Sequence, residues 1–340
     1  MNKERFKEFA YELYAIDSPS GYTKKAIEFL ENKAKSLGFE TSRNQKGNLH
    51  VFVPGKDHSY KVGVSAHTDT LGLMVRSING DGTLRFTNIG GPILPTLDGE
   101  YCRIITRDGK VYTGTILSTS PAVHVFKDAS TAPRNADTMI VKIDEIVKSK
   151  DDVLKLGIMN GDIIAIDPKT TFTESGFIKS RFLDDKISVC TLFEILNMIH
   201  DDKIELAHDT YFIVTTYEEV GHGAANLPEI DELLACDMGC IGQDLTCTEY
   251  DVSICAKDST GPYDYEMVSK LIELAKREEC QYAVDIYPFY GSDVGAALGA
   301  GHNIKGALIG PGVAASHGME RTHMQAIEST VKLLLAYIQA

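Results

Sequence analysis

Histidine and acidic residues stand close together where predicted strands end. His67 and Asp69 directly follow the apolar run VGVSA and are two residues apart. In an extended chain their side chains project on the same face, so the carboxylate can lie behind the imidazole and orient it as a metal ligand. Taken alone, the pair is more simply a surface histidine with ordinary hydrogen bonds.

Two adjacent acidic pairs supply further carboxylates. Asp184 and Asp185 precede the apolar segment ISVCTLFEILNMI, where acidic residues ordinarily cap a helix. Glu218 and Glu219 follow the β-branched run YFIVTT and precede a glycine-flanked turn. Because successive residues of an extended chain project to opposite sides, one glutamate can bind metal while its neighbour faces the substrate as a proton shuttle. The alternative for this pair is a solvated strand end.

Single ligands come from two more segments. Asp237 ends the apolar run LLAC, and the segment ASHGMERTH supplies His317 and His323 before the last predicted helix. Each alone is typical of a solvated loop. Together, one ligand from each of the five segments makes two histidines and three carboxylates, which suits two adjacent cations that share a bridging carboxylate. Such cations polarise a carbonyl and lower the pKa of a bound water, and the protein supplies a base, so amide hydrolysis is the predicted chemistry.

The elements that must position these residues are predicted by the spacing of apolar residues. Helical spacing predicts helices at about 3–16, 23–37, 184–200, 264–279 and 322–338. Short apolar runs predict strands at 48–53, 61–66, 210–216 and 233–236. In α/β sheets, ligands gather at the carboxyl ends of strands, and several of the candidate residues stand at such ends.

Residues 74–170 have a different pattern. They form short β-like runs separated by Gly-Asp and Asp-Gly turn signals, with no long helix between them. We therefore expect one catalytic α/β domain, made of residues 1–73 and 171–340, which is interrupted by a small all-β domain over residues 74–170.

Composition limits the partners and the compartment. The chain has 34 basic and 48 acidic residues, a net charge of −14, which repels nucleic acid and favours metal ions and free amino termini. The charged first residues lack the apolar stretch of a signal peptide, and no run approaches the roughly 18 apolar residues that span a bilayer. The seven cysteines include no CxxC pair. We expect a cytoplasmic protein without membrane or nucleic-acid partners.

These motifs together resemble the M42 family of metalloaminopeptidases, which includes glutamyl, deblocking and tetrahedral (TET) aminopeptidases. The similar segments occur in family order and spacing over almost the whole chain, namely SAHTDTLG (65–72), FLDDK (182–186), TTYEEVG (215–221), CDMG (236–239) and GSDVGAA (291–297). The insertion at 74–170 falls where the family carries its small β domain. The resemblance implies a metallopeptidase-type mixed sheet flanked by helices, and a barrel-like inserted domain that serves dimerisation and assembly.

The resemblance also implies a role for each candidate residue. Two divalent cations would be held by His67 and Asp237 on one side, Asp184 as the bridge, and Glu219 with His317 on the other. Glu218 would be the general base acting on the bridging water, and Asp69 would orient His67.

The last ligand is where the chain departs from the family. Many members have arginine, tyrosine and an aliphatic residue before the ligand histidine, whereas this chain has Ala-Ala-Ser before His317. Distance from the chain end favours His317, and His323 is left as the alternative or as a structural or oligomer contact.

The implied function is that of a dinuclear aminopeptidase that removes N-terminal residues from peptides. Its metals would be Zn²⁺ or Co²⁺, with Mn²⁺ as a further option, and its assembly a homo-oligomer, up to a dodecamer built from dimers. The first alternative is a related two-metal carboxypeptidase or N-acyl amino acid deacylase, but in those families the extra domain is usually an α/β lid after the glutamate pair. The second is a non-catalytic scaffold, which has no need of the complete ligand set.

Three residues near the motifs have simpler interpretations. Asp293, in GSDVGAALGAG, either helps to shape a substrate pocket or belongs to a turn, and its segment lacks the ending of a P-loop. His222 follows the glutamate pair and is assigned no role. Cys236 is expected to be a small buried apolar residue.

Overall fold

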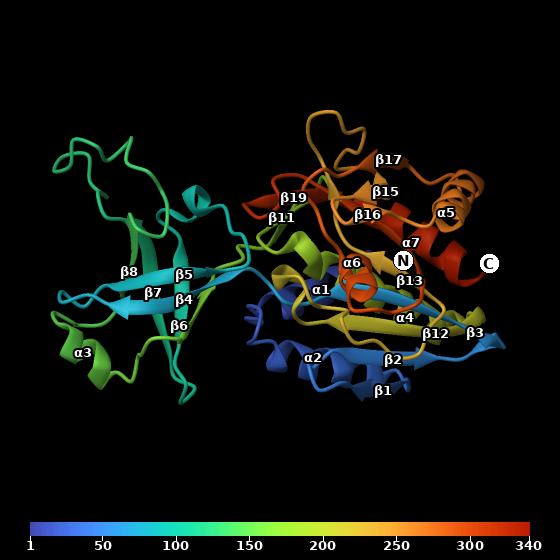
Figure 1. The fold of residues 1–340 in the computed structure, drawn as a ribbon, viewed down its shortest axis with the longest axis horizontal. Coiled ribbons are helices and arrows are strands. Elements are labelled where there is room, and N and C mark those ends of the chain that lie inside the picture. The colour runs from blue at the N-terminus through green and yellow to red at the C-terminus, as the bar shows by residue number, and fades with distance from the viewer. The chain divides into compact units, whose positions relative to one another are not determined.

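The computed structural model describes all 340 residues, Met1–Ala340. The chain forms two compact units, one made of Met1–Thr70 with Lys169–Ala340 and the other of Leu71–Pro168 (Figure 1). No helix is both long enough and apolar enough to cross a lipid bilayer.

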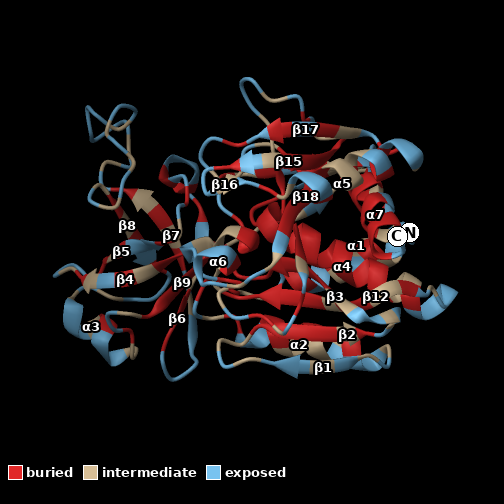
Figure 2. Ribbon diagram, turned by 45° about the vertical axis from the view of Figure 1, so that its right-hand side comes forward, coloured by how far each residue is buried: buried red, intermediate tan, exposed pale blue.

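The larger unit is built on a mixed ten-stranded sheet. Its centre is formed by four neighbouring parallel strands, in the order β12 (Leu206–Thr215), β3 (Gly55–His67), β13 (Glu232–Cys236) and β18 (Lys305–Val313). Apolar runs such as VGVSA and LLAC make up these strands because helices cover parallel strands on both faces. Figure 2 shows that their carboxyl-terminal halves are buried.

Antiparallel strands flank this centre. On one side β2 pairs with β12, and on the other β15 pairs with β18. The remaining strands of the sheet extend these edges or pair with β18. The strands outside the parallel centre are β1 (Glu40–Arg43), β2 (Leu49–Val53), β14 (Gly239–Cys240), β15 (Val252–Asp258), β16 (Gly261–Pro262) and β17 (Tyr282–Ile286). A separate small sheet contains β10 (Thr171–Phe172), β11 (Phe177–Ser180) and β19 (Glu320–His323).

Two apolar helices pack directly on the central strands. Helix α4 (Leu183–Asp202) contacts β3, helix α7 (Met324–Ile338) contacts β18, and the two helices contact each other. Nearly every residue of α4 from Leu183 to Leu196 is buried, as expected for a helix that is apolar all round. The other helices of this unit are α1 (Lys3–Tyr14), which packs on α4, α2 (Lys24–Ser36), α5 (Tyr265–Arg277) and the short α6 (Asp293–Gly299).

The smaller unit is a closed barrel with strands in the order β4, β5, β8, β7, β6, β9. The bounds are β4 (Gly72–Ile78), β5 (Leu84–Ile89), β6 (Tyr101–Ile105), β7 (Val111–Ser118), β8 (Met139–Ile143) and β9 (Ile163–Ile166), with one helix, α3 (Lys150–Lys155). Leu73, Phe86 and Ile104 are among its fully buried residues. Closure leaves no unpaired sheet edge, which is how a unit of short strands becomes stable. The predicted α/β fold with an all-β, barrel-like insertion is confirmed.

Strand β18 is the main element that the sequence pattern did not predict. Its residues, KGALIGPGV, contain glycine and proline, which are typical of turns. One of the glycines is required by close approach, since a Cβ at Gly310 would lie 1.8 Å from the carbonyl oxygen of Asp237. The glycine therefore lets the main chain of Asp237, a predicted metal ligand, pack against β18.

Candidate metal centre

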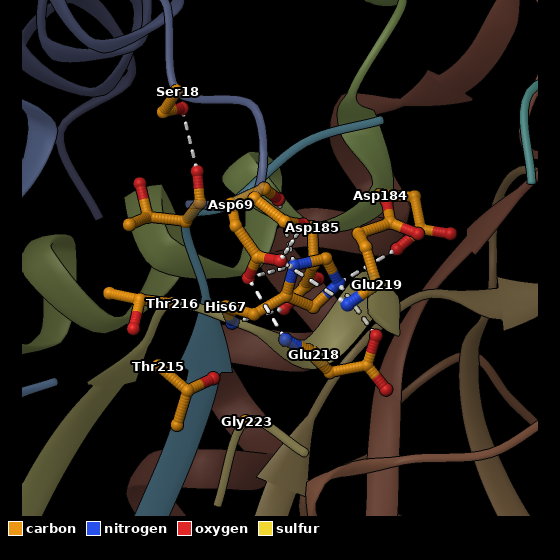
Figure 3. Close-up of polar contacts among 12 residues, drawn as sticks. Ser18, His67, Asp69, Asp184, Asp185, Thr215, Thr216, Glu218, Glu219 and Gly223 are labelled. Atoms are coloured by element: carbon orange, nitrogen blue, oxygen red, sulfur yellow. Dashed lines mark hydrogen bonds and ion pairs between the residues drawn. The ribbon is translucent and has the colours of Figure 1, made fainter. Parts of the chain in front are cut away.

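The predicted site residues gather at one edge of the central sheet. His67 is the last residue of β3, Asp237 directly follows β13, and the glutamate pair lies in a single 3₁₀ turn after β12. Since β12, β3 and β13 are neighbouring parallel strands, their carboxyl ends meet at the same edge. Asp184, near the start of α4, completes this arrangement (Figure 3).

His67 is buried, with 1% of its surface exposed, and its two ring nitrogens face different partners. Nδ1 lies 3.0 Å from the main-chain carbonyl oxygen of Asp69 and 3.5 Å from its Oδ1. Nε2 lies 3.1 Å from Oδ1 of Asp184 and 3.6 Å from Oε2 of Glu218. The ring is thus held from behind by Asp69 and presents Nε2 to the carboxylates, the orientation that a metal-binding histidine needs.

The carboxylate of Asp184 lies between two histidines. Its Oδ1 faces His67, whereas its Oδ2 lies 3.6 Å from Nε2 of His317 and accepts a hydrogen bond from Ser316 Oγ over 3.1 Å. His317 Nε2 is also 3.6 Å from Oε2 of Glu219. The two oxygens of Asp184 therefore face different histidines.

Two clusters of ligand atoms share His67. In each, the atoms lie within 4.8 Å of one another, and the members are His67, Asp184 and Glu219 in one and His67, Asp185 and Asp237 in the other. Four predicted residues, His67, Asp184, Glu219 and Asp237, belong to these clusters. The other three, Asp69, Glu218 and His317, lie within 3.6 Å of a cluster member. His323 does not join them, because its Nε2 bonds to the carbonyl oxygen of Ser175 and its Nδ1 accepts from the N–H of Gln325 at the start of α7.

Burial of several carboxylates together strongly affects their protonation. Burial, and then the charge of Asp184, raises the pKa of Asp237 to about 8. Burial also raises the pKa of Glu218 and of Glu219 well above the usual range. For His67, burial lowers the pKa, but the contacts with Asp184 and Asp69 more than offset it and raise the pKa well above its ordinary value. Several ionised carboxylates buried together destabilise the folded protein unless cations offset their negative charge.

The residues fit divalent metal ions. The side chain of Glu219 is only 3% exposed, and its Oε1 has no hydrogen-bond partner within the protein. The same is true of Oδ1 of Asp185, which is fully buried. Imidazole nitrogen and carboxylate oxygen are the ligands used by catalytic zinc and related metals, and such ions would satisfy these unpaired oxygens.

The loop that carries the glutamate pair is anchored to Asp69. The main-chain N–H groups of Glu218 and Glu219 donate to Oδ1 and Oδ2 of Asp69 over 3.1 and 3.3 Å, and Ser20 Oγ donates to Oδ2 over 2.6 Å. Asp69 was expected to orient His67 through its carboxylate. Its main-chain carbonyl is the closer contact of the ring, which leaves the carboxylate to hold the glutamate turn.

Sequence reasoning missed Glu320. This fully buried residue accepts the N–H of Asp184 at Oε2 over 3.0 Å and the N–H of His317 at Oε1 over 2.9 Å. One carboxylate therefore positions two proposed ligands that are far apart in the chain. The only signal in the sequence is an acid three residues after His317, in a segment rich in polar residues.

Asp293, His222 and Cys236, the three residues noted near the motifs, each have a defined environment in the structure. Asp293 begins α6 and is buried, and its Oδ2 accepts from Thr215 Oγ1 over 2.8 Å at the end of β12. It is therefore a buried residue beside the glutamate turn. The ring of His222 stacks on Tyr217, and Cys236 is fully buried.

Known proteins are similar to this chain over most of its length. The family model described as M42 glutamyl aminopeptidase matches residues 47–333. YhfE of Bacillus subtilis (strain 168), provisionally named an aminopeptidase, is 46% identical over 98% of this chain and 97% of its own. The lysyl aminopeptidase of Pyrococcus furiosus is 28% identical over 61% of this chain and 58% of its own.

Solved structures show the same fold. A TET aminopeptidase from a marine sediment archaeon, Thaumarchaeota archaeon SCGC AB-539-E09, superposes with a TM-score of 0.89 at 20% identity and covers 100% of this chain and 97% of its own. The TET1 peptidase of Pyrococcus horikoshii has a TM-score of 0.85 at 24% identity, over 98% and 99% of the two chains. The resemblance seen in the sequence motifs is thereby confirmed: the chain belongs to the M42 glutamyl aminopeptidase family and is an aminopeptidase, a hydrolase of peptide bonds.

Proposed function

We propose that this aminopeptidase works with two divalent metal ions held at the carboxyl edge of its central sheet. His67 and Asp237 would bind one ion, Glu219 and His317 the other, and Asp184 would bridge them. The observation that carries the proposal is the place of Asp184, whose two oxygens face His67 and His317 at 3.1 and 3.6 Å. Zn²⁺ or Co²⁺ fits this ligand set best, and Mn²⁺ is the next candidate.

The bound cations would polarise the scissile carbonyl and lower the pKa of the attacking water. Glu218 would accept the proton of that water and return it to the leaving amine. Its carboxylate is supported in this role by its position, with Oε2 3.6 Å from Nε2 of His67, and by a main chain held on Asp69. Asp69 would keep His67 in the tautomer that leaves Nε2 free.

The proposed substrates are peptides with a free amino terminus. The acidic site and the net charge of −14 favour a cationic ammonium group over a terminal carboxylate. This polarity distinguishes the proposal from the carboxypeptidase and deacylase alternatives. The decisive experiment incubates one peptide in free and N-acetylated forms and follows the products by mass spectrometry. Loss of residues from the amino end of the free form alone supports the proposal, and release from the carboxyl end overturns it.

A second test addresses the metals. A panel of aminoacyl-p-nitroanilides should be hydrolysed by the purified protein, and activity lost on chelation should return with Zn²⁺, Co²⁺ or Mn²⁺. Full activity after removal of all metal would overturn the dinuclear mechanism.

We also propose that the barrel domain mediates dimerisation and that the dimers assemble further, up to a dodecamer. Two aliphatic side chains of this unit, Val123 and Val125, are more than 70% exposed, at 72% and 74%. Among the structural relatives, PhTET1-12s is described as a dodecamer, and the TET1 peptidase of Pyrococcus horikoshii is described as able to assemble into a tetrahedron or a large octahedral shell. Light scattering on the full chain tests the assembly.

The absence of disulfides among the seven cysteines supports a cytoplasmic location.

A further inference from the structure

A turn far away in the sequence lies against the loop that carries Glu218 and Glu219. The turn consists of residues 44–48 and connects β1 to β2. Because β2 runs antiparallel to β12, the start of β2 lies beside the carboxyl end of β12, where the glutamate loop, residues 216–226, begins. Hydrogen bonds join the two segments at several points.

Asn48 holds the glutamate loop at two places at once. Its side chain is fully buried, and its Oδ1 accepts from Thr216 Oγ1 while its Nδ2 donates to the carbonyl oxygen of Gly223, both over 2.9 Å. Thr216 precedes the glutamate pair and Gly223 follows it (Figure 3). One side chain therefore connects the two ends of the turn that carries the proposed base.

Lys46 adds two more donors to the same loop. Its Nζ donates to the carbonyl oxygen of His222 and, over 3.1 Å, to that of Gly223. The same ammonium group lies 5.6 Å from the centre of the Tyr217 ring. Asn44 contributes a further contact, from Nδ2 to the carbonyl oxygen of Asn226 over 3.2 Å.

The main chain of the loop is thus held from two sides. Asp69 accepts its N–H groups at Glu218 and Glu219, whereas the 44–48 turn donates to its carbonyl groups at His222 and Gly223. A short 3₁₀ turn has few internal hydrogen bonds of its own, so its geometry depends on such external contacts. Displacing a catalytic group by about 1 Å can cost about a hundredfold in rate.

We propose that Asn48 and Lys46 are positioning residues that set the place of Glu218 through the main chain of the glutamate loop. The proposal rests on the assignment of Glu218 as the general base. Neither residue contacts the ligand atoms, so loss of either should lower kcat, with little change in KM and with both metal sites still filled.

The test is a double-mutant cycle on the metal-saturated enzyme with Asn48→Ala, Glu218→Gln and the two combined. We expect Asn48→Ala to lower kcat by about tenfold or more in the wild-type background and to have little further effect beside Glu218→Gln, because coupled residues are not additive. An equal loss in both backgrounds would show that Asn48 acts independently of Glu218 and would overturn the proposal. Unchanged kcat in Asn48→Ala would also overturn it.

Failure of the base assignment is recognised separately. If Glu218→Gln alone turns over like the wild type, the proposed function of Glu218 is wrong and the positioning role fails with it. If Glu218→Gln is inactive and Asn48→Ala is unaffected, only the positioning role is wrong.

Two further measurements separate positioning from a general loss of structure. Lys46→Met should lower kcat, and Lys46→Arg should lower it less, because arginine also carries a positive charge and N–H donors. In metal-free protein, Asn48→Ala should speed amide hydrogen exchange in peptides covering residues 217–226 and leave the barrel unchanged. Asn79→Ala is the matched control, because it removes one side-chain hydrogen bond, from Asn79 Nδ2 to Thr83 Oγ1, that spans a hairpin of the barrel. Exchange that rises throughout the larger unit would contradict local positioning.

Discussion

The main-chain N–H of Glu218 donates a hydrogen bond to Oδ1 of Asp69 over 3.1 Å. Asp69 also holds the ring of His67 through its main-chain carbonyl, so one residue joins a proposed metal ligand to the proposed base. The sheet edge makes this possible because β3 and β12 end side by side.

Glu218→Gln and Glu219→Gln should separate two roles of neighbouring residues. The amide of Glu218→Gln cannot accept a proton, so kcat should fall by about 10²–10⁴ with metal content unchanged. Glu219→Gln removes a proposed charged ligand, so metal and activity should be lost together and partly return with excess metal. Metal stoichiometry and kcat are measured on both variants in parallel. Metal loss in Glu218→Gln with retention in Glu219→Gln would exchange the assignments.

Asp184→Asn should weaken both metal sites together, because each oxygen of Asp184 faces a different histidine. His67→Ala should mainly empty one site. Elemental analysis after dialysis distinguishes the two patterns. Equal loss from both substitutions would mean that Asp184 does not bridge, and a wild-type protein that saturates with one equivalent would contradict the two-metal proposal.

Glu320→Gln should weaken metal binding by about 10–100-fold, although Glu320 is not proposed as a ligand. Its two oxygens hold the main chain of Asp184 and of His317, and an amide can accept only one of these hydrogen bonds well. Titration with Zn²⁺ against a competing chelator measures the change. Glu328→Gln, a partly exposed acid paired with Lys3, is the control and should bind metal like the wild type.

Metal-free protein should lose stability as the pH rises. Burial raises the pKa of Asp237 from 3.8 to about 8, so the folded state binds a proton that the unfolded state has released. Its contribution to stability is therefore complete below the unfolded pKa and is lost as the pH rises through the folded one. The buried glutamates act in the same direction.

Urea unfolding of chelated protein should accordingly give a falling free energy of unfolding between about pH 5 and about pH 9. Added Zn²⁺ should remove most of this fall, because the ions compensate the ionised carboxylates. Asp237→Asn should flatten the profile of the metal-free protein. A slope identical to that of the wild type would contradict the contribution of Asp237.

Gly223→Ala should lower activity without large unfolding. An added Cβ would lie 2.4 Å from Oδ1 of Asp293 and 3.1 Å from the main-chain nitrogen of Glu218, so the glutamate turn or α6 must shift. Steady-state kinetics and thermal unfolding check this together. Gly80→Ala is the control, since a Cβ there would meet nothing within 4 Å. Wild-type kcat in Gly223→Ala would show that the turn tolerates displacement.

The local pattern of the chain was sufficient to predict the fold class and most of the candidate site. Strand periodicity is a property of successive residues, so the runs before His67, Glu218 and Asp237 already predicted strand ends that carry candidate site residues. The apolar segment after Asp184 predicted a helix for the same reason. Motif order then identified the family, which the comparisons confirmed.

Only the tertiary structure decided which residues meet. His317 rather than His323 lies beside Asp184, and Glu320 holds the main chain of Asp184 and of His317. Asn48 bonds to a loop at two residues that are 168 and 175 positions further along the chain. Strand β18 also escaped prediction, because its Gly310 is required by the close approach of Asp237 and not by a turn. These contacts depend on strand order and on packing between distant segments, and short-range periodicity carries no information about either.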